Sequence, residues 1–174
     1  MILRRRYDLV LAIYPQSRGF AFALFESWLS PVDWGIHEAR GSRKNAHCLT
    51  RINSLLELHM PDVVVLQNMS DRGTRRVPRI QELNRRIADL ADLRGMVIHK
   101  YSRAQVLEYF GERGATTKQK IAETIAKQVP ALNLYVPPER KPWMSEDPRM
   151  GIFDATALAW MFFHSIRGDE QEAA

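Results

Sequence analysis

Short apolar runs separated by turn-forming residues occupy the first part of the chain. Two of them cover residues 9–13 and 20–25, and residues 15–19 between them have the proline, serine and glycine of a turn. A third run covers residues 32–38. Because the runs contain β-branched and aromatic residues and the links are short, we predict three strands in an antiparallel meander.

Beyond these strands the apolar positions recur at helical spacing. Cys48, Ile52 and Leu55 lie on one face of an amphipathic helix predicted over residues 44–59. Residues 63–66 are then apolar without alternation, which is typical of a strand that is covered on both faces. This succession of helix-spaced and continuous apolar segments indicates an α/β arrangement.

The second half of the chain continues the succession and ends in helices. A helix around residues 80–90 precedes a strand at residues 96–98. We then predict helices at residues 103–110, 116–129 and 151–166, a proline-rich irregular loop at 131–150, and an acidic, frayed tail at 168–174. The predicted fold is one α/β domain over residues 1–174, a five-stranded mixed sheet with its first three strands antiparallel and helices on both faces.

Composition agrees with one globular domain and narrows the classes of function. Hydrophobic residues make up 45% and charged residues 26% of the chain, which excludes a disordered or collagen-like protein. The single cysteine, Cys48, excludes an internal disulfide and predicts a small buried side chain. No apolar run is long enough for a membrane span or a signal peptide, so we expect a cytoplasmic protein without membrane contact.

The chain has 25 basic and 20 acidic residues, a formal net charge of +5 and a pI of about 9.6. Such a surplus suits an anionic partner such as nucleic acid, DNA above all, although many enzymes share it. Arginine forks after the fourth strand suit phosphate oxygens, although a solvated helix face has the same composition. The candidate nucleic-acid-binding residues are Arg72, Arg75, Arg76 and Arg79, followed by Arg85 and Arg86, together with Lys118 and Lys120, which start a helix behind Gly114 and are otherwise ordinary surface lysines.

Four segments resemble the RuvC Holliday-junction resolvases and their relatives, in the same order and spacing over nearly the whole chain. They are residues 11–19, similar to the family's opening strand and turn; 61–67, similar to its fourth strand; 101–121, similar to its tyrosine-basic-valine helix and lysine-bearing helix start; and 154–159, similar to its closing helix. This resemblance implies a ribonuclease H-like fold and phosphodiester hydrolysis with two divalent metal ions held by carboxylates.

At the positions that the resemblance assigns to metal-binding acids, this sequence departs from the family. Tyr14 stands where an aspartate ends the first strand, and Gln67 stands where a glutamate ends the fourth. Asp154 keeps its carboxylate in the last helix, whereas Gly151 and Ala157 stand where a second helix acid would lie. Because the family's first and fourth strands are neighbours, we expect Tyr14 and Gln67 to lie close together at one edge of the sheet.

These substitutions predict weak metal binding or none. Mg²⁺ is held by charged oxygen ligands, whereas tyrosine is neutral and bulky and glutamine lacks the charge of glutamate. Asp154 is therefore a weak metal candidate, and no cofactor is expected unless Mg²⁺- or Mn²⁺-dependent nuclease activity survives. Asp71 and Asp147 are the loop acids that would have to supply the missing ligands, and the alternative is that both are ordinary solvated acids.

Three hypotheses about function follow. The first is a RuvC-like pseudoenzyme of DNA recombination, which binds branched or duplex nucleic acid with little or no nuclease activity. The second is an active metal-dependent Holliday-junction endonuclease with non-standard ligands, and the third is a structural interaction module that retains only the fold. Tyr101 and Tyr109 are either base-stacking or packing residues. The aromatic last helix around Trp160 is either core or the face of a homodimer.

Overall fold

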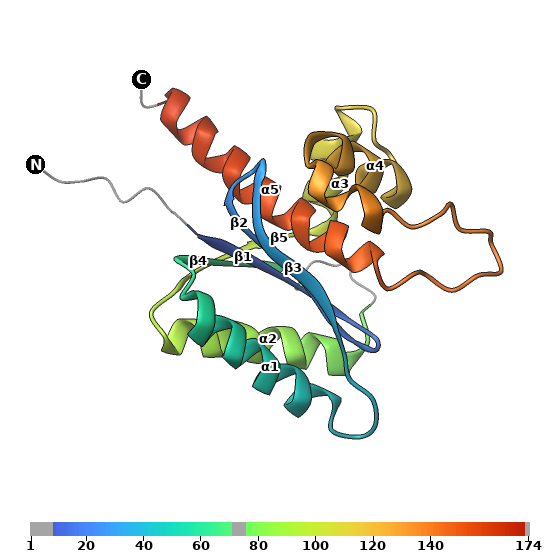
Figure 1. Ribbon diagram of the computed structural model, residues 1–174. Helices are drawn as coiled ribbons and strands as arrows, with labels where there is room; N and C mark the ends of the chain where they lie inside the picture. Colours follow the sequence, from blue (N-terminus) through green and yellow to red (C-terminus); the bar gives the residue numbers. More distant parts are fainter. Residues whose placement is uncertain (1–8, 71–75, 173–174) are drawn as a thin grey trace, which may run out of the picture.

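The computed structural model describes residues 9–70 and 76–172, with residues 169–172 described by their backbone alone (Figure 1). The helices and strands follow one another in the predicted order. They are β1 (Val10–Gln16), β2 (Gly19–Ser27), β3 (Ser30–Glu38), α1 (Lys44–His59), β4 (Val63–Gln67), α2 (Pro78–Leu93), β5 (Val97–Tyr101), α3 (Arg103–Gly111), α4 (Lys118–Gln128), the 3₁₀ helix η1 (Pro130–Tyr135) and α5 (Met150–Glu172).

Two segments differ from their prediction. The loop predicted at residues 131–150 contains η1, which Pro130 begins, because proline has no N–H group to leave unpaired at the start of a helix. The last helix continues past residue 166 to Glu172, beyond its predicted end. Glutamate and glutamine, which predominate at its end, favour helix once a helix has formed before them.

The strands form one mixed sheet in the order β3-β2-β1-β4-β5. The pairs β1–β2 and β2–β3 are antiparallel, whereas β1–β4 and β4–β5 are parallel. The predicted five-stranded mixed sheet is therefore confirmed. Its parallel part brings the carboxyl ends of β1, β4 and β5 to the same end of the sheet (Figure 1).

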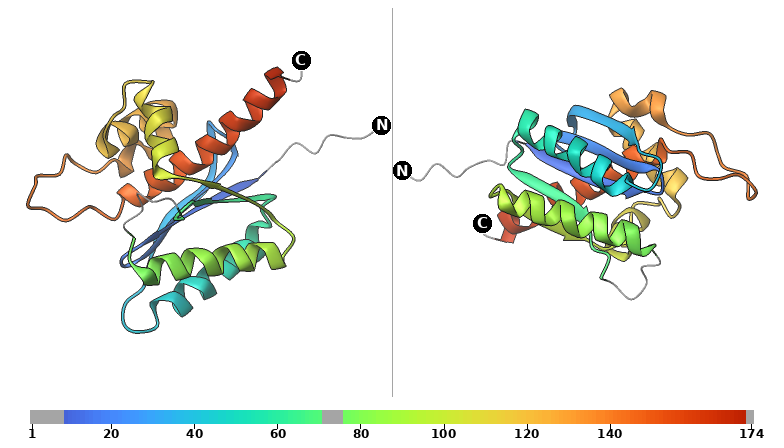
Figure 2. Two further views of the ribbon diagram at one scale, coloured as in Figure 1. Left: turned by 180° about the vertical axis from the view of Figure 1, so that it is seen from behind. Right: turned by 90° about the horizontal axis from the view of Figure 1, so that it is seen from below.

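Two hydrophobic cores lie on opposite faces of this sheet, because successive side chains of a strand point to opposite faces. On β1, Leu11 and Ile13 pack into the core beneath α1 and α2, whereas Val10 and Ala12 pack into the core beneath α5. Helices α1 and α2 cover one face, and α5 with α3 and α4 covers the other (Figure 2). By the same alternation, Tyr14 shares the α5 face with Ala12.

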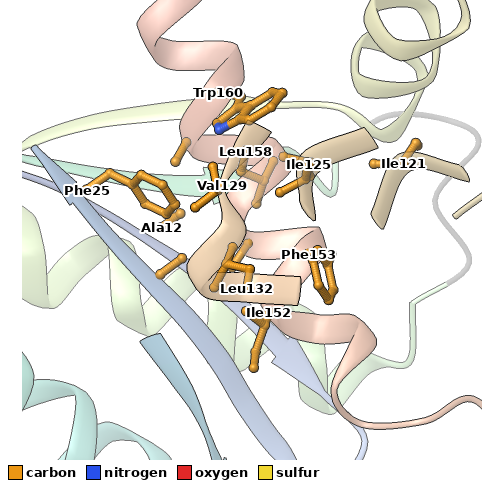
Figure 3. Close-up of a cluster of buried hydrophobic side chains, with 14 of the residues drawn as sticks. Ala12, Phe25, Ile121, Ile125, Val129, Leu132, Ile152, Phe153, Leu158 and Trp160 are labelled. Carbon is orange, nitrogen blue, oxygen red and sulfur yellow. The ribbon is translucent and has the colours of Figure 1, made fainter. Parts of the chain in front are cut away.

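The core beneath α5 settles the place of the aromatic last helix. Figure 3 shows Phe153, Leu158 and Trp160 of α5 among side chains of α4 and the sheet. Trp160 is only 3% exposed, and its ring lies 5.9 Å from that of Phe110. Trp160 is thus part of the core, as the packing alternative predicted. Cys48 is likewise buried, in the other core.

No helix in residues 9–70 and 76–172 combines the length and the apolar character that crossing a membrane requires.

Candidate functional site

A cavity lies where the carboxyl ends of β1, β4 and β5 meet helices α3, α4 and α5. Tyr14, Gln67, Lys118 and Asp154 all line it, so the fold brings together residues that are far apart in the sequence. Tyr14 and Gln67 lie close together, as predicted, but the prediction that they lie at an edge of the sheet is wrong. Their strands are adjacent and interior to the sheet, and the pairing of Ala12 with Val65 sets the two side chains level.

Asp154 and Lys118 form the central ion pair of this site. Lys118 Nζ lies 3.3 Å from Asp154 Oδ2 and 2.8 Å from Glu146 Oε1, so a single ammonium group binds two carboxylates. The side chain of Asp154 is 17% exposed and that of Lys118 29% exposed. Glu146 lies in the loop before α5, and the sequence analysis missed it, because nothing in a proline-rich segment predicts the path of the chain.

Burial and charge shift the pKa values of this pair. Burial raises the pKa of Asp154 to about 6, although Lys118 opposes the shift. The pKa of Lys118 is also raised: burial lowers it, but Asp154, Tyr14 and Glu146 together outweigh burial. The ammonium of Lys118 is therefore charged at neutral pH, and it is firmly held by its two carboxylates.

Tyr14 lies between two cations. Its ring centroid is 5.0 Å from Arg76 Cζ and 5.7 Å from Lys118 Nζ, distances at which a cation attracts the face of an aromatic ring. Arg76 Nη1 also donates a hydrogen bond of 3.5 Å to the Tyr14 hydroxyl. Burial and the charge of Asp154 raise the pKa of Tyr14, so the side chain is neutral and offers no anionic oxygen.

The arginines named as candidates in the sequence differ in their contacts: two bind neighbouring segments of the fold, and two form ion pairs within α2. Arg76 donates to the carbonyl oxygen of Pro15, and Arg79 donates to Asn45 Oδ1 at 2.9 Å and to the carbonyl oxygen of Ser17 at 3.1 Å. These contacts join the start of α2 and the residues before it to β1, to the turn after β1 and to α1. Arg85 and Arg86 both pair with Glu82, whereas Arg72 and Arg75 lie outside the described residues.

The remaining candidate residues, a lysine, two acids and two tyrosines, also differ in their surroundings. Lys120 is exposed in the first turn of α4, where its backbone N–H is capped by Thr117 Oγ1. Asp147 binds Arg149 at 2.6 Å, and that contact lowers its pKa, so it is engaged away from Asp154. Asp71 lies outside the described residues. Tyr101 lines the cavity, whereas Tyr109 packs against Phe110 and His164.

The start of α5 leaves no room for a second helix acid. A Cβ added to Gly151 would come within 2.2 Å of Gln16 Nε2 and 2.8 Å of Ala21 Cβ. Gln16 Nε2 in turn donates to the carbonyl oxygen of Pro148 at 3.1 Å. Glycine at residue 151 thus permits the close contact of α5 with β1 and β2 that places Asp154.

The residues present do not fit a pair of divalent metal ions. A two-metal centre needs several carboxylates around each ion, but here a neutral phenol and a neutral amide accompany Asp154. The Asp154 carboxylate is already bound by an ammonium group. Across residues 9–70 and 76–172, no cluster of three or more histidine, cysteine, aspartate or glutamate side chains is arranged to hold a metal ion.

The solved structures that this chain resembles include Holliday junction resolvases. Thermus thermophilus RuvC in complex with a Holliday junction substrate matches with a TM-score of 0.66 and 13% identity, over 92% of this chain and 96% of RuvC. The yeast mitochondrial Holliday junction resolvase Ydc2 matches with a TM-score of 0.58 and 14% identity, over 90% of this chain and 78% of Ydc2. The fowlpox virus Holliday junction resolvase matches with a TM-score of 0.52 and 15% identity, over 91% of this chain and 99% of the resolvase.

At these identities the likeness establishes the fold: the chain has the RuvC-like, ribonuclease H-like architecture that the sequence predicted. By sequence, it matches no known protein family and no curated protein.

Proposed function

We propose that this chain binds branched or duplex DNA without efficient metal-dependent cleavage. One observation carries the proposal: Asp154, the only acid kept where the resemblance places metal ligands, binds the ammonium group of Lys118. The fold supports DNA as the partner, because the structures that it resembles are Holliday junction resolvases, one of them in complex with a junction.

Exposed basic residues at the cavity and in the first turn of α4 support the same partner. Arg103 of α3 and Lys120 of α4 are exposed, and within the described residues neither forms an ion pair. Lys118, by contrast, is neutralised by its two carboxylates. In this proposal Arg103 and Lys120 contact DNA phosphates, while Lys118 holds the site together.

A fluorescent four-way junction, titrated in EDTA at a series of salt concentrations, tests this function. We expect the logarithm of the binding constant to fall with the logarithm of salt concentration by about 0.9 per phosphate contact. Lys120→Ala should weaken binding and reduce that slope by about one. Lys127→Ala, which removes the same charge from the far end of α4, is the matched control and should bind like the wild type.

Two outcomes would contradict the proposal. Absence of binding, or binding that does not depend on salt, would favour a protein-interaction module instead. Cleavage of the junction by the wild type in Mg²⁺ or Mn²⁺, abolished by Asp154→Asn, would identify an active endonuclease.

A further inference from the structure

The loop between η1 and α5 contains a tryptophan that the fold leaves in water. Trp143 is 78% exposed, whereas Trp160 in the core is 3% exposed. Figure 1 shows this loop, in orange, projecting away from the sheet and the helices. Tryptophan is enriched at interfaces, where a partner covers the apolar area of its ring. Packing within the chain does not account for Trp143, so its ring is available to a partner.

A tight turn holds Trp143 in place. The N–H group of Met144 donates to the carbonyl oxygen of Lys141 at 3.0 Å, which closes a β-turn over residues 141–144. Pro142 occupies the second position of this turn, where its fixed φ angle favours the turn conformation. Trp143 follows at the third position. Because the backbone beneath the ring is already ordered, a partner that binds the ring pays little conformational entropy for this segment.

Both ends of the loop are attached to the first turn of α4. At its beginning, Gln119 Nε2 donates to the carbonyl oxygen of Pro137 at 2.9 Å, and near its end Glu146 Oε1 lies 2.8 Å from Lys118 Nζ. The next residue of α4, Lys120, is exposed, and the proposed function assigns it to a DNA phosphate. The loop thus begins and ends beside the surface to which DNA binding is assigned.

Cations lie beside the ring of Trp143. Lys141 Nζ is 5.4 Å from the ring centroid, and both Arg140 and Lys141 are exposed. Residues 138–145 contain these two bases and one acid, Glu139, and thus have a net charge of +1. A flat ring with cations beside it matches a nucleotide, which has a flat base and a phosphate together. A lipid surface offers phosphates without a flat ring to stack.

We propose that Trp143 stacks on an unpaired base of the bound DNA, while Arg140 and Lys141 contact neighbouring phosphates. The inference rests on the proposed binding of DNA and names the segment of the chain that distinguishes unpaired from paired DNA. Within a duplex both faces of a base are already stacked, whereas a base at a branch point or in a single strand can expose one face. Since every base has such a face, the contact should not depend on base sequence.

Binding of a short, labelled oligothymidylate, measured by fluorescence anisotropy in EDTA at a series of salt concentrations, tests this inference. Trp143→Ala should weaken binding about tenfold and leave its salt dependence unchanged, because the indole ring is uncharged. Lys141→Ala should instead reduce the slope of the logarithm of the binding constant against that of salt concentration by about 0.7, the value for one phosphate contact on a single strand. Leu134→Ala, which removes an 88% exposed apolar side chain from η1, is the matched control and should bind like the wild type.

Two further variants separate stacking from apolar contact. Trp143→Leu keeps an apolar side chain without a flat ring and should bind as weakly as Trp143→Ala, whereas Trp143→Phe keeps a ring and should retain most of the affinity. Oligothymidylate should quench the tryptophan emission of the wild type but not that of Trp143→Phe, because the other three tryptophans, Trp28, Trp34 and Trp160, are buried or half-buried.

Wild-type affinity of Trp143→Ala or Trp143→Leu for oligothymidylate would refute stacking. A blue shift of the wild-type emission with vesicles of phosphatidylserine and phosphatidylcholine, without quenching by oligothymidylate, would assign Trp143 to a membrane surface and also overturn the inference. In either case, binding of the four-way junction by the wild type would leave the proposed function standing. Conversely, binding of oligothymidylate through Trp143 without binding of the junction or of a duplex would refute the proposed function and keep the stacking contact.

Discussion

Lys118 lies at the N-terminal end of a helix, where the helix dipole disfavours a cation. It is the first residue of α4, and the backbone dipoles of a helix make its N-terminal end positive. The carboxylates of Asp154 and Glu146 compensate for this, and the ring of Tyr14 adds a weaker attraction. The cation bound to Asp154 is thus the ammonium group of Lys118, a side chain of the protein itself.

The raised pKa of Asp154 predicts how stability depends on pH. Burial raises it from 3.8 to about 6, so the folded protein binds this proton more tightly than the unfolded chain does. The stabilisation is present below about pH 4 and is lost as the pH rises through about 6. Asp154→Asn has no such proton, so the difference in unfolding free energy between the two proteins should change by up to about 3 kcal/mol over this interval.

Urea unfolding at a series of pH values measures that difference. Asp92→Asn, on an exposed position of α2, is the control and should keep the wild-type profile. If the difference in unfolding free energy between the wild type and Asp154→Asn stays constant from about pH 4 to about pH 7, burial does not raise the pKa of Asp154.

The sequence predicted which site residues are substituted but not what replaces the lost ligands. Tyr14, Gln67 and Asp154 were named because the resemblance to the RuvC family places metal-binding acids at these three positions. The partners of Lys118 were not found, because ion pairs between segments 28 and 36 residues apart leave no local pattern. The sequence analysis named Asp71 and Asp147 as candidate loop acids, whereas Glu146, the neighbour of Asp147, contacts Lys118.

At the scale of elements, the start of α5 decides where Asp154 lies. The helix approaches β1 and β2 closely only because residue 151 has no side chain. The apolar pattern predicted that a helix begins near this residue, but periodicity contains no information about how closely a helix approaches a sheet.

Gly151→Ala should therefore destabilise the protein, by about 1–3 kcal/mol, because the added methyl group overlaps Gln16 and Ala21. Gly168→Ala in the same helix is the matched control: nothing lies within 4 Å of its added Cβ, and alanine favours helix by up to about 1 kcal/mol. Thermal unfolding followed by circular dichroism compares the two. Equal stability of Gly151→Ala and the wild type would show that α5 can move away from the sheet at no cost.

The strands were predictable as short apolar runs, several of them bounded by turn residues, and most helices were predictable from their helical period. The 3₁₀ helix η1 was not, since a few residues beginning at a proline are too short to establish a period. The end of α5 differs from its prediction for a different reason: its last residues are polar, so the apolar pattern ends before the helix does.

At the scale of the whole molecule, the parallel strands bring a cavity, an internal ion pair and exposed basic side chains to one end of the sheet. The formal charge of +5 suits a polyanion. In the proposed function, these features form a surface that binds DNA rather than a centre that hydrolyses it. Restoring a metal centre would require removing the internal cation as well as adding acids, so Tyr14→Asp, Gln67→Glu and Lys118→Ala are needed together.

Calorimetric titration of the wild-type protein with Mn²⁺ at neutral pH tests this view most directly. The account predicts no saturable heat, because the carboxylates of Asp154 and Glu146 are both bound by Lys118, while Tyr14 and Gln67 are neutral. The triple variant is the positive control and should bind Mn²⁺. Saturable binding of Mn²⁺ by the wild type, lost in Asp154→Asn, would contradict the account and place a metal centre at this site.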